Sequence, residues 1–200
     1  MKIFKLTNSA RKRGVSLIEG VLYLVIALAV IVGGIVFFQQ AQLSNQVTDT
    51  ARAGVAISSQ TRGLYQSQRT FGENDITPAL IRAGAVPSNF LNAAGDSVVH
   101  PFDAAGTITV NGNGEGFSMT ITNLSEAACA RLATVGEGGD GPLGTGIIGM
   151  TIAADTSTID YTGGLAAPAA VAPVSAADVA TLCVEDATNN LPDVTVFYGR

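Results

Sequence analysis

Histidine, tryptophan and cysteine are scarce in this chain of 200 residues, which contains one histidine, no tryptophan and two cysteines. His100, the sole imidazole, lies next to Pro101 and leaves no plausible histidine-based metal cluster and no strong signal of a Ser/His/Asp triad, so we interpret it as a loop or core residue. The glycine-rich segment 136–144 lacks the Lys-Ser/Thr pair of a phosphate-binding loop, so we interpret it as a surface turn. The sequence therefore predicts no enzyme, no catalytic or metal site and no cofactor.

Basic residues are also few, and they are unevenly placed. The chain has 11 of them against 16 acidic residues, and five of the 11 lie in the first thirteen positions. If a leader ending at Gly14 were removed, six arginines would remain against sixteen acidic side chains, a net charge of -10 with no lysine. So acidic a chain is not expected to bind nucleic acid directly.

A stretch without charge, from Val21 to Phe38, follows the basic cluster. Extended by uncharged amides and small residues to Ser44, it approaches the roughly 20 residues that cross a bilayer core of ~30 Å. The basic cluster should stay in the cytoplasm, which places the rest of the chain on the other side of the membrane.

Three interpretations of this stretch compete. A cleaved secretory signal would have a shorter apolar core followed by a small-residue cleavage site, whereas the Ala-x-Ala candidates here begin at Ala27, inside the run, and at Ala51, well past it. A plain membrane anchor has the right length but leaves Glu19 unexplained, because an unpaired carboxylate in lipid costs several kcal/mol. In a plain anchor, the simplest account of Glu19 is that its side chain snorkels to the membrane face. The third interpretation instead gives Glu19 a partner.

The residues RKRG followed by VSLIEG, positions 11–20, resemble the prepilin processing site of type IV pilins. The resemblance implies that a prepilin peptidase cuts after Gly14, that it methylates the new amino terminus at Val15, and that the apolar helix is retained. It also implies that Glu19 pairs with the terminal amine of a neighbouring subunit, which fits the rule that a buried charge is tolerated only when paired. Valine at this amino terminus, where phenylalanine is more common, is typical of the type IVb branch.

No proline occurs between Val15 and Thr77, and we expect one helix from about Ser16 to Arg69. Gly33 and Gly34 within it indicate either close packing against another helix or a weak point where the helix can stretch. A seven-residue spacing predicts the apolar face of its second half: Leu43, Thr50, Ile57, Leu64 and Phe71, with Val47 and Gly54 beside them.

The predicted organisation has three parts: a cleaved basic leader at 1–14, a transmembrane and polymerisation half of the helix at 15–40, and a head at 41–200 that includes the amphipathic half of the helix. Sequence patterns in the head predict strands, helices and one exposed Ala/Pro-rich loop. The expected elements are a short helix through Leu80 and Ile81, strands at 106–110, 117–122, 146–152, 157–161 and 194–198, a helix capped by Ser125, a loop within 163–178, and a helix from Ser175 through Cys183.

The segments LIRAGAVPSNF and HPFDAAGTITVNG are similar to the heads of pilins from thin conjugative pili and related type IVb systems, with His100, Asp103 and Ala104 replacing the usual Asn and two Gly. The fold expected is α+β: a pilin fold, in which a long amino-terminal helix packs against an antiparallel sheet. Cys129 and Cys183 lie too far apart for a CxxC redox or zinc motif. In an exported chain they are expected to form one disulfide, the alternative being two buried free thiols.

The resemblance implies a structural subunit of a type IV pilus, located in the bacterial inner membrane with a periplasmic head before assembly and in an extracellular pilus afterwards. Its expected partners are other pilin subunits, inner-membrane lipid, the prepilin peptidase, the pilus assembly machinery, and a host or recipient cell surface in adhesion, aggregation or conjugation. A minor pilin or a type II secretion pseudopilin shares the same processing motif. A membrane-anchored periplasmic binding domain is the alternative from a different class.

Overall fold

The computed structural model describes residues 17–135, 139–153, 176–185 and 191–199. Contacts divide the chain into two units, residues 1–42 and 43–200. The long helix α1 spans Leu17–Leu64, with Glu19 in its first turn and Arg62 in its last turn, the placement of charge that the helix dipole favours. The predicted helix is confirmed, but it ends at Leu64 rather than near Arg69. The Tyr65 N–H still bonds four residues back, to the Thr61 carbonyl at 3.1 Å, but the Gln66 N–H bonds three residues back, to the Gly63 carbonyl at 3.4 Å, a tightened turn typical of a helix end.

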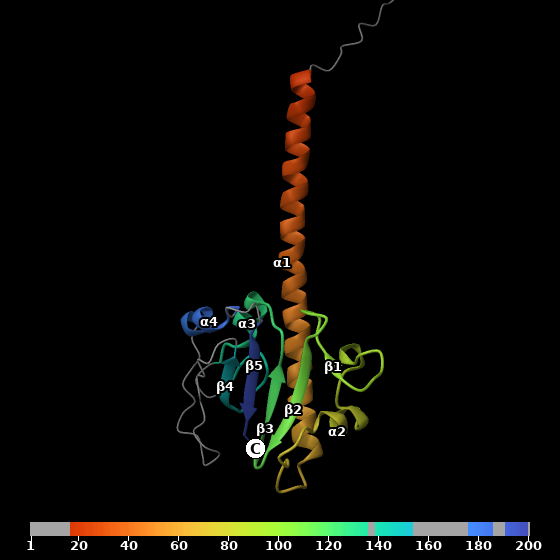
Figure 1. The fold of residues 1–200 in the computed structure, drawn as a ribbon, viewed down its shortest axis with the longest axis vertical. Helices are drawn as coiled ribbons and strands as arrows, with labels where there is room; N and C mark the ends of the chain where they lie inside the picture. Colours follow the sequence, from red (N-terminus) through yellow and green to blue (C-terminus); the bar gives the residue numbers. More distant parts are fainter. Residues whose placement is uncertain (1–16, 136–138, 154–175, 186–190, 200) are drawn as a thin grey trace, which may run out of the picture. The chain divides into compact units, whose positions relative to one another are not determined.

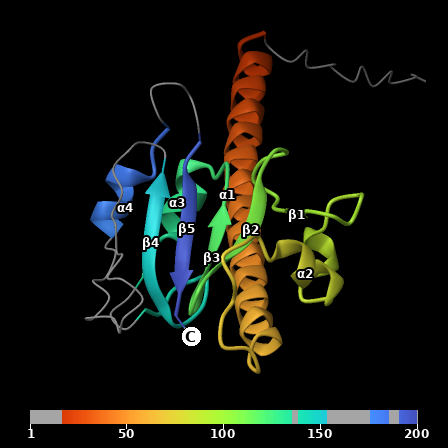
Figure 2. The same cartoon turned by 60° about the horizontal axis from the view of Figure 1, so that its bottom comes forward.

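Among the described residues, five strands form one antiparallel sheet in the order β1-β2-β3-β5-β4, which Figure 2 shows with α1 behind it. The predicted hairpin is confirmed as β2 and β3, with Val110 opposite Met119 and the left-handed Gly114 at its turn. The strands expected at 146–152 and 194–198 are present as β4 and β5, and the short β1 was not predicted. The strands are β1 Val98–Val99, β2 Thr107–Asn113, β3 Gly116–Ile121, β4 Ile147–Ala153 and β5 Asp193–Tyr198.

The sheet packs against residues 43–64 of α1 (Figure 1). In β2 and β5 buried and half-buried residues alternate, because successive side chains of a strand point to opposite faces. Apolar residues from the inner face, such as Met119 and Val196, form one core cluster with Ala53 and Ile57 of α1. A Cβ on Gly54 would lie 2.9 Å from the Leu143 side chain, so glycine permits a close approach of helix and loop here.

The apolar face of α1 was predicted correctly at its centre and wrongly at its end. Thr50, Gly54 and Ile57 are buried, and Leu43 and Val47 are half-buried. Leu64, however, is 41% exposed, and Phe71 is buried from the loop that follows the helix. A strict seven-residue spacing drifts by about 20° per heptad around a straight helix, so the buried face moves instead to Ser58 and Thr61.

Short helices complete the head. They are α2 Thr77–Arg82, the 3-10 turn Ser88–Phe90, α3 Glu126–Leu132 and α4 Ala176–Leu182. The predicted Ser125 cap is present, since its side chain accepts a hydrogen bond from the Ala128 N–H. The strand expected at 157–161 and most of the Ala/Pro-rich loop expected within 163–178, with the Ser175 cap, lie outside the described residues.

Candidate functional site

The first candidate site is the apolar segment 17–38 of α1. Its large hydrophobic side chains, from Leu17 to Phe38, are all at least 52% exposed in the isolated chain. Among the residues that the structure describes, α1 is the one helix with a stretch long and apolar enough to cross a membrane. So much exposed apolar surface is unfavourable in water, so this segment needs lipid or other apolar helices around it.

Glu19 is the one charged residue within this apolar segment. It is exposed in the first turn of α1, where the partial positive charge of the helix terminus favours an acidic side chain. Among the described residues, the Glu19 carboxylate makes no hydrogen bond and no ion pair. The one ion pair between described residues joins Arg52 and Asp49, at 3.8 Å. Gly14 and Val15, the residues of the predicted cleavage and methylation sites, lie outside the described residues.

Gly33 and Gly34 do not interrupt α1, which is continuous through both. A Cβ built on either glycine meets nothing within 4 Å. Close packing within the chain therefore does not require glycine at these positions. Both sequence-based explanations, packing against another helix and a weak point in α1, stay predictions.

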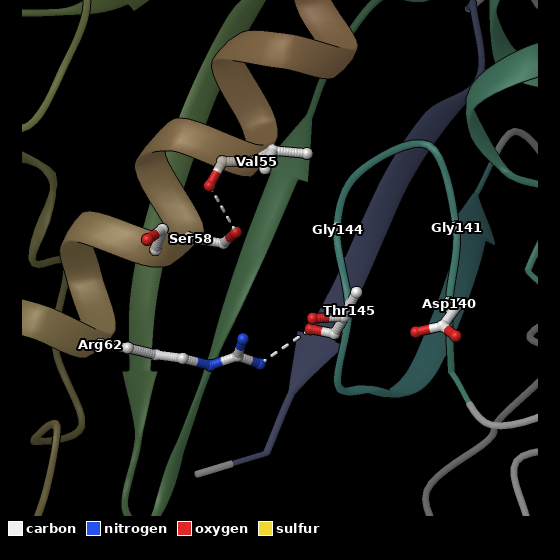
Figure 3. A pocket seen from close by; sticks show the side chains of 8 residues that line it. Val55, Ser58, Arg62, Asp140, Gly141, Gly144 and Thr145 are labelled. Atoms are coloured by element: carbon white, nitrogen blue, oxygen red, sulfur yellow. Dashed lines mark hydrogen bonds between the residues drawn. The ribbon is translucent and has the colours of Figure 1, made fainter.

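In the head, Arg62 fastens the end of α1 to two distant segments. One guanidinium nitrogen, Nη2, donates to the carbonyl of Thr145 at 2.9 Å (Figure 3) and lies 3.5 Å from the carbonyls of Gly146 and Gly199. The guanidinium carbon also lies 5.6 Å from the centre of the Tyr198 ring. These contacts hold the 139–146 loop, the last strand and α1 together, so Arg62 positions the head on its helix.

The aromatic pair beneath Arg62 belongs to β3 and β5. The rings of Phe117 and Tyr198 are stacked with centres 4.8 Å apart, and the Tyr198 hydroxyl donates to the Leu143 carbonyl at 2.7 Å. Burial raises the pKa of the Tyr198 phenol, an effect that the Arg62 charge partly offsets. Tyr198 is therefore a neutral hydrogen-bond donor that ties the loop to the sheet.

The predicted disulfide joins Cys129 of α3 to Cys183, the residue that follows α4. Both cysteines are buried, and the described part of the chain contains no free cysteine. The Glu126 carboxylate accepts a hydrogen bond from the Glu185 N–H at 3.1 Å on the same side of the head. The alternative of two free thiols is thus excluded, and α4 is held to α3 by a covalent bond.

His100 and Asp103 organise the turn between β1 and β2. Both were noted in the sequence as departures from the Asn and Gly of similar pilin heads. The His100 ring donates from Nε2 to the Thr122 carbonyl at 2.5 Å and accepts at Nδ1 from the Phe102 N–H at 3.3 Å, a pattern that requires the neutral imidazole. Asp103 accepts from the Ala105 N–H at 2.8 Å. A Cβ on Gly106 would overlap the imidazole, so a glycine is needed there. The interpretation of His100 as a loop or core residue is confirmed, since it follows β1 outside any helix or strand and is buried.

Burial lowers the pKa of His100, against the opposing effects of the Thr122 hydrogen bond and the Asp103 and Asp193 carboxylates. In the described residues no group of three or more metal-ligating side chains is found.

Sequence reasoning missed Arg62 altogether. An arginine near a helix end is common, and its carbonyl partners lie 83 or more residues away, so no local signal indicated its role.

Comparisons with known proteins match most of the chain. A family model described as PilS N terminal matches residues 44–195. The major structural subunit of bundle-forming pilus from Escherichia coli O111:H- is 28% identical over 196 residues, which cover 94% of this chain and 97% of that protein. The subunit of the same name from Escherichia coli O127:H6 (strain E2348/69 / EPEC) has the same identity and coverage. A crystal structure of a type IVb pilin from Salmonella typhi aligns with a TM-score of 0.49 and 16% identity, covering 75% of this chain and 97% of that one.

Proposed function

Since this chain belongs to the PilS N-terminal family, we propose that it is the structural subunit of a type IV pilus of the IVb branch. It is an anchored membrane protein before assembly and part of a fibre afterwards, and its partners in the fibre are other pilin subunits. Two similar proteins are each named as the major structural subunit of bundle-forming pilus. The work of the protein is mechanical, and its head serves adhesion, aggregation or conjugation rather than catalysis.

The observation that carries this proposal is the exposed apolar segment with a single carboxylate near its start. Segment 17–38 has no partner for its apolar side chains within its own helix, and Glu19 has none for its charge among the described residues. Lipid surrounds the apolar side chains before assembly, and neighbouring helices surround them in the fibre. In both environments an unpaired charge is costly, so Glu19 favours a position where a cation meets it.

The cation is the amine that cleavage creates. We propose a leader 1–14, cut after Gly14 by a prepilin peptidase in the inner membrane, which then methylates the amine of Val15. Residues 15–40 form the transmembrane and polymerisation half of the helix, and residues 41–200 form the periplasmic head. The assembly machinery inserts each subunit where the Val15 amine of one chain meets Glu19 of the next, which sets the axial register.

Replacing Glu19 tests this function, with Glu115 as the matched control because it is also an exposed acid, at the β2–β3 turn. Loss of one partner from a buried ion pair costs about 3–5 kcal/mol, so Glu19→Ala should lower the yield of sheared fibres at least tenfold. Glu115→Ala should stay within twofold of the wild type. Membrane insertion and cleavage should be unchanged in both variants, and normal fibre yield from Glu19→Ala would refute the assembly role.

Intact mass and amino-terminal fragmentation of sheared protein test the processing sites independently. We expect a chain that begins with methylated Val15 and is two hydrogens lighter than its reduced form because of the disulfide. A chain that still begins at Met1 and occurs in membranes alone would leave an anchored domain without a role in a fibre.

A further inference from the structure

A groove runs along the outer surface of α1 in the head, bounded on the opposite side by the loop that precedes β4. It consists of two adjoining hollows of about 430 and 460 Å³, both of which include Val55 and Ser59 in their walls. The first also contains Arg62, Asp140 and Thr145 (Figure 3). The second extends along α1 past Arg52 and is bounded by Pro142. We call this surface the Val55 groove.

Val55 makes the centre of the groove apolar. It is 43% exposed, and in the described residues of the head two other large hydrophobic side chains, Leu64 and Val184, are comparably exposed. Neither of those two lines either hollow. An apolar centre with a polar and charged rim is the usual composition of a protein interface.

The rim of the groove is richer in positive charge than the rest of the head. Residues 43–200 contain six arginines, no lysine and fifteen acidic residues, and two of the six arginines, Arg52 and Arg62, line the groove. The Arg62 guanidinium is already held in place by the Thr145 carbonyl, so little side-chain freedom is lost when it meets a partner. The lining of the groove contains these two arginines against one acidic residue, Asp140, whereas acidic residues outnumber arginines by fifteen to six in residues 43–200 as a whole, so the groove complements a second copy.

We propose that the Val55 groove is the site at which the head binds an acidic surface of a second copy of this chain in the fibre. This inference rests on the proposed function and names a contact of the head in addition to the contact of the helices. An open fibre requires that each contact joins two different surfaces, since a contact between identical surfaces closes a dimer. The groove of one subunit therefore receives a surface other than the groove of the next.

Two matched substitutions in the full-length protein test the contact. Val55→Asp places a negative charge in the apolar centre, where it also repels an acidic partner, and we expect sheared fibre yield to fall at least tenfold. Val184→Asp makes the same chemical change at 41% exposure outside the groove and should stay within twofold of the wild type. Wild-type yield from Val55→Asp, or equal losses from both variants, would overturn the proposal.

A photo-crosslinking residue at Ser59 tests the same contact without relying on a destabilising change. Ser59 is exposed and lines both hollows. In intact fibres we expect a covalent dimer, with the crosslink mapped to a peptide of the second copy that contains an acidic side chain and lies outside the groove segments 48–62 and 140–145. No dimer, a crosslink to a different protein, or a crosslink to either groove segment of the second copy would contradict the inference.

Failure of the groove and failure of the proposed function give different results. If the groove is wrong, wild-type fibres form, Glu19→Ala lowers their yield at least tenfold and Val55→Asp does not. If the proposed function is wrong, the wild type forms no fibre or Glu19→Ala leaves it intact. The near-ultraviolet circular dichroism of Val55→Asp in detergent should match that of the wild type, which separates an assembly defect from a failure of the head to fold.

Discussion

Arg62 is the residue whose replacement most directly tests how the head is held on α1, and Arg62→Met is the informative change. Methionine keeps an unbranched apolar stem over the rings of Phe117 and Tyr198 but removes the charge and the hydrogen bonds. The donor to the Thr145 carbonyl at 2.9 Å is lost, and so is the cation above the Tyr198 ring. The two carbonyls at 3.5 Å are at the limit of hydrogen bonding and count little.

The expected size of the effect follows from these contacts. A hydrogen bond from a charged donor contributes about 1.5–3 kcal/mol, and the low end applies because Thr145 is exposed and water can replace the donor. A cation over a ring adds about 0.5–1 kcal/mol. One contribution has the opposite sign. Nε of Arg62 is buried without a hydrogen-bond partner, so its removal stabilises the folded chain by about 1 kcal/mol. The net loss of unfolding free energy is therefore about 1–1.5 kcal/mol, or a fall of about 2–6 °C in Tm for a protein of this size.

Denaturant and thermal unfolding of the full chain in detergent, followed by near-ultraviolet circular dichroism, would measure this loss. The signal reports the packing of tyrosine and phenylalanine in the head, since the chain has no tryptophan. Arg52→Met on the same helix is the control, because Arg52 is 78% exposed and its ion pair with Asp49 is long, so a loss below about 1 kcal/mol is expected. Equal midpoints for the two variants would refute the role assigned to Arg62.

Two further predictions concern the head. His100 has a pKa below its ordinary value of 6.5 in the folded chain, so the unfolded chain takes up the proton first as pH falls. The stability that neutral His100 contributes is complete above pH 6.5 and is lost below it as pH falls through the lowered pKa; unfolding midpoints should therefore decline more steeply on acidification in the wild type than in His100→Gln, and parallel pH profiles would exclude this role. The Cys129–Cys183 disulfide has a sequence separation of 54, which corresponds to about 4 kcal/mol in the chain-entropy model. The double substitution of both cysteines by alanine should lower unfolding free energy by an amount of that order, and a change under about 1 kcal/mol in chemical denaturation would contradict it.

Much of the fold could be predicted because it depends on local pattern. The proline-free run after Val15 predicted α1, and alternation on either side of Gly114 predicted the hairpin. Errors arose where one element met another. The seven-residue spacing placed Leu64 on the buried face, but the sheet covers the helix along its actual period of 3.6 residues, which carries Leu64 away from the core.

The sequence by itself determined that this chain has an apolar helix, that one carboxylate lies near the start of that helix, and that an acidic α+β head with two cysteines follows. These properties follow from composition and from periodicities of 2 and 3.6 residues, which neighbours in the sequence carry. The tertiary structure alone decided that Arg62 reaches the Thr145 carbonyl, that His100 is neutral among its partners, and that Val55 lies at the centre of a groove. Each of these features depends on residues that lie far apart in the sequence and that the packing of helix, loop and sheet brings together.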